Sequence, residues 1–273
     1  MPKPYHYRAR LQGKVAIVTG AGSQESGVGT GSAIAIVFAG EGAKVCLLDR
    51  DASRAELTRA KIITEGGDAS VIIGDVTDDT ECARLVAEAT LRYGGVDILV
   101  NNVGIASAPG KLDTFDEDAW NRVISVNLKS AVLMSRHAIP EMIRRHGGAI
   151  VNIASIAATR GFGFGVAYGP SKAAMIALSR DLAVMYGGEG IRVNTIAPGH
   201  IFTPLSQGLS GDEARAVRRK AGPLGIEGDA WDVAAATLFF ASDEARFITA
   251  TCLAVDGGVT ETGSLIAHAM ITR

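Results

Sequence analysis

Residues 14–38, KVAIVTGAGSQESGVGTGSAIAIVF, carry the first decision about the fold. A β-branched apolar run ends at Thr19 and Gly20, a glycine-rich stretch follows, and apolar residues at helical spacing begin near Ser32. This order predicts a buried strand, a tight turn and a helix. Backbone N–H groups at a helix N-terminus bind phosphate, so the turn is a candidate nucleotide site. Glycines also simply make turns, and alone the stretch is weak evidence for a nucleotide.

The same alternation of strand and helix patterns runs through the chain. Buried strand candidates lie at 14–20, 44–49, 70–75, 96–102, 149–155, 191–199 and 252–258, with helical spacing at 33–40, 52–65, 80–93, 117–145 and 170–187. Such alternation forms right-handed βαβ units on a parallel sheet. We therefore expect one doubly wound α/β domain, with a seven-stranded parallel sheet and helices on both faces.

No repeat or linker divides the 273 residues, so we expect a single domain at 11–273 after a loose N-terminal extension at 1–10. The irregular stretch is at about 200–228, with Gly and Pro at both ends. Because ligands sit beyond the carboxyl ends of such strands, this stretch is a candidate lid. Its basic run at 215–220 is either a solvated helix or a contact for an anionic substrate.

Composition excludes several classes of function. A net charge of −2 lacks the basic excess that nucleic-acid binding requires. Three isolated cysteines make a disulfide framework or a structural zinc improbable and fit a reducing cytoplasm. The five histidines show no metal spacing, so we expect surface or loop residues and no metal site. Neither a signal peptide nor a run of about 18 apolar residues occurs, so we expect no membrane association.

Asp49 ends the second strand candidate, twenty to thirty residues after the glycines. An acid there can bind both adenosine ribose hydroxyls and repel a 2′-phosphate, which indicates NAD rather than NADP. Two alternatives stay open: Asp49 caps the next helix, or Arg50 beside it receives a phosphate.

Tyr168 and Lys172 are four residues apart, so on a helix both emerge from one face, and Pro170 suits its first turn. A neighbouring ammonium lowers the pKa of a tyrosine from about 10, which allows acid–base work near neutrality. Ser155 ends the fifth strand candidate and could bind the same substrate oxygen. Without other motifs, a Tyr and a Lys at this spacing more often lie on the solvent-exposed face of a helix.

The chain resembles the short-chain dehydrogenase/reductase family. The resemblance rests on TG at 19–20, GDV at 74–76, NNVG at 101–104, VNL at 126–128, Ser155, YGPSK at 168–172 and PG at 198–199. It covers about Leu11 to Gly258 and implies a Rossmann domain with a nicotinamide cofactor. Each motif is common, but their order and spacing together are specific.

The resemblance also implies roles for individual residues. Asn127 would be the fourth catalytic residue beside Ser155, Tyr168 and Lys172, and would hold a water that links Lys172 to solvent. Lys172 would also hold the nicotinamide ribose. Asp75 and Val76 would face the adenine, Asn102 and Gly104 would support the nucleotide, and Ile201 and Thr203 would contact the carboxamide. Val76 could equally be core, and Asn101, Asn102 and Gly104 could form a turn.

We therefore expect an NAD-dependent oxidoreductase that interconverts a secondary alcohol and a ketone, with Tyr168 as acid and base. Two alternatives are an NADPH-dependent 3-oxoacyl thioester reductase and an NAD(H)-binding sensor without catalysis. Phe162, Phe164, Phe202 and Leu205 in the pocket segments suggest an uncharged, partly apolar substrate. The resemblance suggests a homotetramer.

The glycine stretch allows two alignments to the family's GxG. If GVG at 27–29 is that pair, the helix gains two residues and its apolar face turns by roughly 200°. We prefer GTG at 29–31, which keeps the helix register. Gly20, Gly29, Thr30 and Gly31 then contact the nucleotide, and Ser23 donates to a phosphate. Residues 24–28 then form an inserted bulge over the adenosine side, and Glu25 points toward solvent. We expect that NAD binding does not require this bulge.

Overall fold

The computed structural model describes residues 8–24, 26–107, 109–163, 165–204 and 211–272. Seven parallel strands form the main sheet in the order β3-β2-β1-β4-β5-β6-β9. They are β1 (Val15–Thr19), β2 (Lys44–Asp49), β3 (Asp68–Ile73), β4 (Ile98–Asn101), β5 (Gly148–Ile153), β6 (Ile191–Pro198) and β9 (Cys252–Val255). The predicted doubly wound sheet is confirmed.

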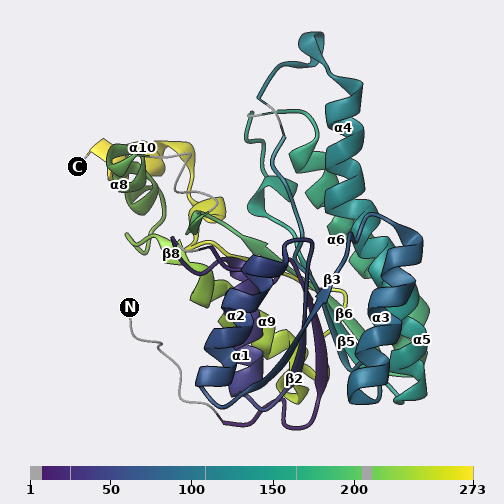
Figure 1. Cartoon of the computed structure of the whole chain (residues 1–273). Coiled ribbons are helices and arrows are strands. Elements are labelled where there is room, and N and C mark those ends of the chain that lie inside the picture. Colours follow the sequence, from purple (N-terminus) through teal and green to yellow (C-terminus); the bar gives the residue numbers. More distant parts are fainter. Residues whose placement is uncertain (1–7, 25, 108, 164, 205–210, 273) are drawn as a thin grey trace.

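Helices cover both faces of this sheet (Figure 1). On one face lie α1 (Thr30–Gly40), α2 (Ala52–Thr64) and α9 (Ala230–Ala241), and on the other α3 (Asp79–Tyr93), α5 (Ser130–Arg144) and α6 (Tyr168–Tyr186). Alternate strand residues pack into the two cores: Ala16 and Val18 lie with α1 and α9, and Ile17 lies with α3 and α5. Because β1 is buried on both faces, its sequence is continuously apolar.

Some boundaries differ from the sequence expectation. Helix α1 begins at Thr30, two residues before Ser32, and β3 begins at Asp68 rather than residue 70. The helix expected at 117–145 is divided into α4 (Glu117–Ile124), a π-helical turn η2 (Ser125–Lys129) and α5. Helix α9 was not singled out because its sequence, AWDVAAATLFFA, is apolar on nearly all sides and shows little periodicity.

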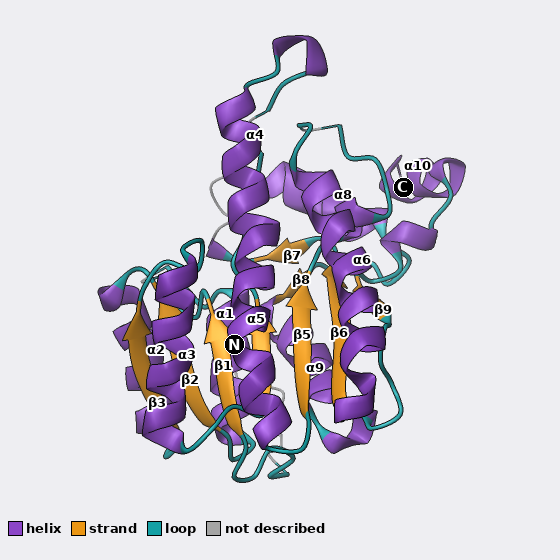
Figure 2. Ribbon diagram, turned by 90° about the vertical axis from the view of Figure 1, so that its right-hand side faces the viewer, coloured by secondary structure: helices purple, strands orange, loops and turns teal. Residues whose placement is uncertain are grey.

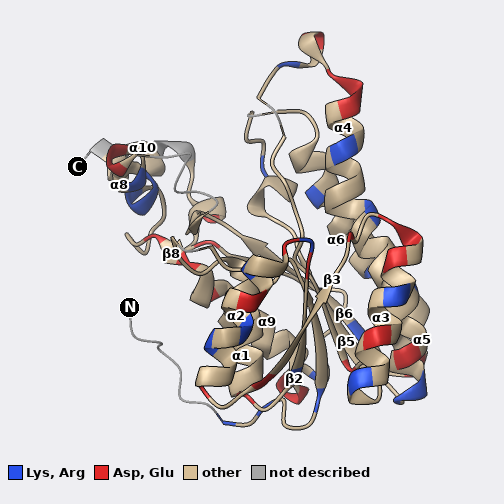
Figure 3. Cartoon of the chain, viewed as in Figure 1, with Lys and Arg blue, Asp and Glu red and all other residues tan. Residues whose placement is uncertain are grey.

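Several elements extend beyond the carboxyl ends of the strands (Figure 2). They are α4, α8 (Asp212–Ala221), α10 (Ser264–Thr272) and a small parallel sheet of β7 (Ile201–Phe202) and β8 (Gly228–Asp229). Acidic residues gather at the start of α4 and basic residues at the end of α8 (Figure 3). Asp116 is the N-cap of α4 and accepts a hydrogen bond from Ala119 N, as an acidic helix start should.

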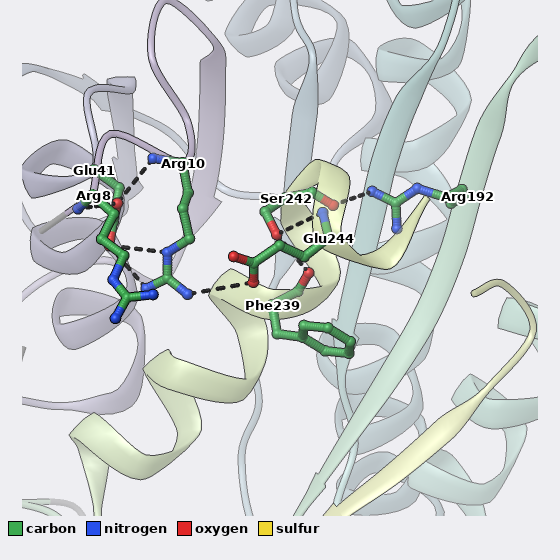
Figure 4. Close-up of polar contacts among 7 residues, drawn as sticks. All are labelled: Arg8, Arg10, Glu41, Arg192, Phe239, Ser242 and Glu244. Atoms are coloured by element: carbon green, nitrogen blue, oxygen red, sulfur yellow. Dashed lines mark hydrogen bonds and ion pairs between the residues drawn. The ribbon is translucent and has the colours of Figure 1, made fainter. Parts of the chain in front are cut away.

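The end of the N-terminal extension is fixed, which corrects our expectation for residues 8–10 (Figure 4). The fully buried carboxylate of Glu41 accepts hydrogen bonds from the backbone N–H groups of Arg8 and Arg10 and from the Arg10 guanidinium, at 2.8 to 3.1 Å. Arg10 also lies 3.6 Å from Glu244 beyond α9. Burial would raise the pKa of Glu41, but the hydrogen bonds from Arg10 and Arg8 lower it.

Among the described residues, none of the helices combines the length and apolar character needed to cross a bilayer.

Candidate active site

A cavity of about 740 Å³ opens at the carboxyl ends of β1 and β4, where the strand order reverses direction. Ligands of doubly wound sheets bind at this switch point. The structure gathers most of the sequence-predicted site residues around it: Gly20, Gly29, Thr30, Gly31, Asp49, Asp75, Val76, Asn102, Gly104, Ser155, Tyr168, Lys172, Ile201 and Thr203.

The glycine turn fits the GTG alignment. Gly29 is the N-cap of α1, and Gly31 lies in the first turn. A methyl group on Gly31 would stand 2.1 Å from the Gly20 carbonyl oxygen, whereas one on Gly29 would meet nothing within 4 Å. Gly20 has a φ of 64°, in the left-handed region that favours glycine. Helix α1 can therefore pack directly on the end of β1, with its N-terminus open to the cavity.

Two positions in this stretch differ from expectation. Ser23 is fully buried, and its hydroxyl accepts a hydrogen bond from the Thr58 hydroxyl at 3.2 Å, so it faces α2 rather than a phosphate. Gln24 lines the cavity although we expected the insertion to stay clear of the nucleotide. Gly27 lies beside Pro204, so this part of the insertion contacts the segment that we expect to be a lid, and closure over the adenosine side stays a prediction. Glu25 lies outside the described residues.

The ribose end of the cavity contains Asp49, Arg50 and Arg54. The Asp49 carboxylate accepts hydrogen bonds from Gly22 N at 2.8 Å and Asp51 N at 3.0 Å. Asp51, rather than Asp49, is the N-cap of α2, which removes the capping alternative. Arg54 was missed because an arginine in a first helical turn gives no signal in the sequence; its guanidinium pairs with Asp51 at 3.2 Å.

The side chain of Asp75 turns toward its own loop. It accepts hydrogen bonds from Thr77 N and the Thr77 hydroxyl, at 2.9 and 2.7 Å, and the bond from the backbone lowers the pKa of Asp75. Val76 is almost fully buried and also reaches the cavity wall, and its contact with adenine stays a prediction.

Asn102 joins two strand ends below the glycine turn. Its side-chain amide donates to the carbonyl oxygens of Thr19 and Gly20, at 3.0 and 3.1 Å. The turn function that we considered for Asn102 is therefore present, and the residue also lines the cavity.

The opposite end of the cavity holds the residues of the reacting centre. Tyr168 is the first residue of α6, Lys172 lies about one turn later, and Ser155 follows β5. The Lys172 Nζ atom donates to the carbonyl oxygen of Ile153 at 2.8 Å and lies 6.0 Å from the centre of the Tyr168 ring. Lys172 is buried and Tyr168 is partly buried, so the pair is not a solvated helix face.

Burial sets the protonation of this pair. It lowers the pKa of Lys172 to about 8 and raises the pKa of Tyr168, which a hydrogen bond with Ser155 only partly offsets. The lowered pKa that we expected for Tyr168 beside Lys172 is therefore not found in the chain by itself, because burial raises this pKa. Tyr168 keeps its proton at neutral pH.

Asn127 lies behind these residues, fully buried in η2. Its side-chain oxygen accepts a hydrogen bond from Ile105 N at 2.7 Å, and its amide donates to the Ile105 carbonyl and the Ser171 hydroxyl, both at 3.0 Å. The side chain thus holds the loop after β4 against α6. It does not line the cavity itself.

The cavity fits a nicotinamide dinucleotide. No side-chain cap occupies the first-turn N–H groups of α1, so these donors remain for a pyrophosphate. The close approach at Gly31 leaves no space for a side chain, and Asp49 stands at the ribose end. Among the described residues, no cluster of His, Cys, Asp or Glu could hold a metal ion.

The substrate segments are less predictable from sequence. Phe162 packs edge-on against His200, and the guanidinium of Arg215 stacks on Phe202 with its central carbon 3.5 Å from the ring centre. Neither phenylalanine lines the cavity, and Phe164 and Leu205 lie outside the described residues. His200 is half-buried and lies in the loop between β6 and β7, which agrees with the expected surface or loop position. The residues near Tyr168 that were missed are Ile105, Ala106, Arg122, Ser125 and Val126.

Comparisons with known proteins agree on one family. A family model described as enoyl-(acyl carrier protein) reductase matches residues 22–260. The 2-(S)-hydroxypropyl-CoM dehydrogenase 3 of Xanthobacter autotrophicus is 38% identical over 256 residues, covering 92% of this chain and 98% of the relative.

Solved structures show the same likeness. A chain from Burkholderia xenovorans, described as a short-chain dehydrogenase/reductase, is 43% identical with a TM-score of 0.88 and covers 93% of this chain and 99% of its own. A 7α-hydroxysteroid dehydrogenase complexed with NADH and 7-oxo glycochenodeoxycholic acid is 36% identical, with a TM-score of 0.86. The match covers 92% of this chain and 95% of that chain.

Proposed function

Because the chain belongs to the short-chain dehydrogenase/reductase family and is an oxidoreductase that interconverts a secondary alcohol and a ketone, we propose that it uses NAD and that Tyr168 carries the proton. The observation that carries this proposal is the convergence of Ser155, Tyr168 and Lys172 at one end of a cavity whose other end has a glycine turn and Asp49. The spacing of these groups along one cavity suits a dinucleotide bound between them.

In this proposal the bound nicotinamide supplies hydride chemistry, and the chain supplies the proton and the orientation. Tyr168 gives its phenol proton to the carbonyl oxygen in reduction and, as tyrosinate, takes the hydroxyl proton in oxidation. Ser155 donates a hydrogen bond to the same oxygen. Lys172 holds the nicotinamide ribose, and Asn127 positions the loop after β4 and the water that links Lys172 to solvent.

The raised pKa of Tyr168 affects the two directions of the reaction, reduction and oxidation, differently. The protonated phenol, which reduction needs, is the form present at neutral pH. Oxidation needs the tyrosinate, whose fraction increases as the pH rises through the tyrosine pKa. We therefore expect the oxidation rate to rise with pH and the reduction rate to fall.

Asp49 supports NAD over NADP. Its carboxylate is held by Gly22 N and Asp51 N at the ribose end, where a 2′-phosphate would meet negative charge. Arg50 and Arg54 also line this end, and their positive charges would attract a 2′-phosphate. In this proposal Asp49 favours NAD over NADP despite these two charges.

The experiment is a panel of secondary alcohols and ketones with both cofactors, followed by nicotinamide absorbance, for the wild type and Asp49→Ala. We expect wild-type turnover with NAD(H), and a smaller preference for NAD over NADP in Asp49→Ala, expressed as the ratio of kcat/KM values. An unchanged ratio would show that Asp49 does not select the cofactor.

The same panel distinguishes the proposed function from two alternatives. The matched family model carries the description of an acyl-carrier-protein reductase, so an NADPH-dependent 3-oxoacyl thioester reductase is the alternative activity. Preference for a 3-oxoacyl thioester with NADPH would select it. NADH binding without turnover of any substrate would select a sensor.

We also propose an uncharged, partly apolar substrate, because Ile105, Ala106 and Ile201 line the cavity that contains Tyr168. The segment at about 200–228 would cover this substrate as a lid. A homotetramer is supported by exposed apolar residues at the β9 edge of the sheet, including Leu253 and the 97% exposed Phe247. A cytoplasmic location is supported by the three free cysteines.

A further inference from the structure

The insertion in the glycine stretch, residues 24–28, is anchored between the cavity and the lid segment. Gln24 and Gly27 form an antiparallel bridge, in which each backbone N–H donates to the other's carbonyl oxygen, at 3.3 and 3.1 Å. A methyl group on Gly27 would lie 3.4 Å from Pro204 Cγ, and Val28 packs against the core beneath α1 and α9. Both sides of the insertion are thus supported by the fold.

The side-chain amide of Gln24 is a polar group of this insertion that the described part of the chain leaves without a hydrogen bond. Gly27 uses the backbone N–H and carbonyl of Gln24, and no hydrogen bond joins its side chain to another residue in the described part of the chain. Gln24 nevertheless lines the cavity. A primary amide has two N–H donors and no charge, so it can donate to an anionic oxygen without titrating.

The neighbours of Gln24 indicate which part of a dinucleotide it would meet. Two residues before it, Gly22 N binds the Asp49 carboxylate at the ribose end. Three residues after it, Gly27 meets Pro204 where the lid segment begins. Along the chain Gln24 therefore lies between these two contacts, and it lines the same cavity as Gly29 and Thr30 at the open N-terminus of α1. The middle of a dinucleotide is its pyrophosphate.

We propose that Gln24 donates a side-chain hydrogen bond to the pyrophosphate of the dinucleotide, so that the insertion adds a binding residue to the site. The proposal rests on the proposed function, because it assumes that this cavity binds a nicotinamide dinucleotide. Deletion of residues 24–28, for which we expected no needed contact to NAD, should therefore weaken NAD binding.

The test measures the Kd of NADH by nicotinamide fluorescence and the Kd of ADP-ribose by calorimetry. Gln24→Ala should weaken both ligands about tenfold, as the loss of a hydrogen bond to a charged group does. Gln24→Glu should weaken both further, because a carboxylate there repels the phosphates. Ser26→Glu is the matched control: Ser26 is exposed on the same insertion, so the same added charge should change either Kd by less than about twofold.

Three results would contradict the proposal. One is Gln24→Glu binding both ligands as tightly as the wild type, and another is an equal loss in Ser26→Glu. The third is a loss confined to NADH, which would place the amide at the nicotinamide half. If the cavity does not bind a nicotinamide dinucleotide, the result is different, since the wild type would then not bind NADH at all, and turnover in the substrate panel tests the catalytic function separately. Thermal melts of each variant show whether the fold is retained.

Discussion

At the scale of single residues, the reacting groups are held by groups that do not react. Lys172 is 3% exposed and fixed to the Ile153 carbonyl, and Asn127 is fixed to the backbone of Ile105. These bonds limit the positions of the ammonium and of the loop after β4 before any ligand binds. Such preorganisation is what a proton-transfer site requires.

The buried Lys172 makes stability depend on pH in a defined direction. Its pKa falls from 10.5 to about 8 in the folded chain, so at neutral pH the fold holds a charge that burial disfavours. This cost is fully present below about pH 8 and disappears as pH rises toward the unfolded pKa. Relative to Lys172→Met, which carries no charge, the wild type should therefore gain stability from neutral to alkaline pH.

Urea unfolding of both proteins at pH 7 and pH 10 measures this effect. The difference in unfolding free energy between the wild type and Lys172→Met should change by roughly 2 to 3 kcal/mol in favour of the wild type. Other titrating groups are common to both proteins and cancel. A difference that stays constant with pH would mean that the Lys172 pKa is not lowered by folding.

At the scale of elements, the site depends on how α1, α5 and α6 meet the strands. The π-helical turn η2 interrupts the helix between α4 and α5 and turns Asn127 into the interior. Such turns often mark functional positions. Its presence was not predictable, because SVNLK has no distinctive composition and the apolar spacing continues across it.

A buried polar chain connects α6 to the strands beneath it. The Asn101 amide donates to Asn152, the Asn152 amide donates to the Ser179 hydroxyl, and the Thr195 hydroxyl donates to the same oxygen, each at 2.8 Å. The chain runs from β4 through β5 to α6 and β6. It fixes α6, and hence Tyr168 and Lys172, against the sheet.

The two glycines of GTG give a matched test of the turn. In Gly31→Ala the new methyl would overlap the Gly20 carbonyl, so α1 or β1 must shift, and we expect a loss of about 1 to 3 kcal/mol in unfolding free energy. In Gly29→Ala the methyl meets no atom within 4 Å, so stability should stay nearly unchanged. Denaturant unfolding of both variants measures this.

Gly29→Ala, the control for Gly31→Ala, also tests the binding of NADH. Because Gly29 borders the cavity, its alanine variant should weaken NADH binding while remaining folded. Equal stability losses in the two variants would contradict the packing of α1 on the end of β1.

At the scale of the whole molecule, the strand and helix alternation predicted the architecture well. Seven apolar runs that alternate with helical patterns leave few topologies, and burial on both faces of a parallel sheet makes most of these runs continuous and easy to recognise. The candidate site was predictable wherever a motif ends a strand or begins a helix, as at Asp49, Ser155 and Tyr168. Helix α9 and the small β7–β8 sheet lacked such patterns.

The remaining residues depend on tertiary contacts. Ser23 turns toward Thr58, Gln24 turns into the cavity, and Arg10 meets Glu41 across 31 residues. The direction of a loop side chain and the partner of a distant charge follow from packing, which spacing along the chain does not encode. The pKa of Tyr168 likewise follows from burial and not from the spacing of its motif.

The most direct test of the central claim compares the wild type with Tyr168→Phe, using an alcohol that the wild type oxidises. The ring remains and the proton carrier is lost, so NADH should bind with a Kd within about twofold of wild type while kcat falls by about 10² to 10⁴, the range typical of a lost general acid or base. Near-normal turnover in Tyr168→Phe would contradict the account, because the proton would then pass through another group.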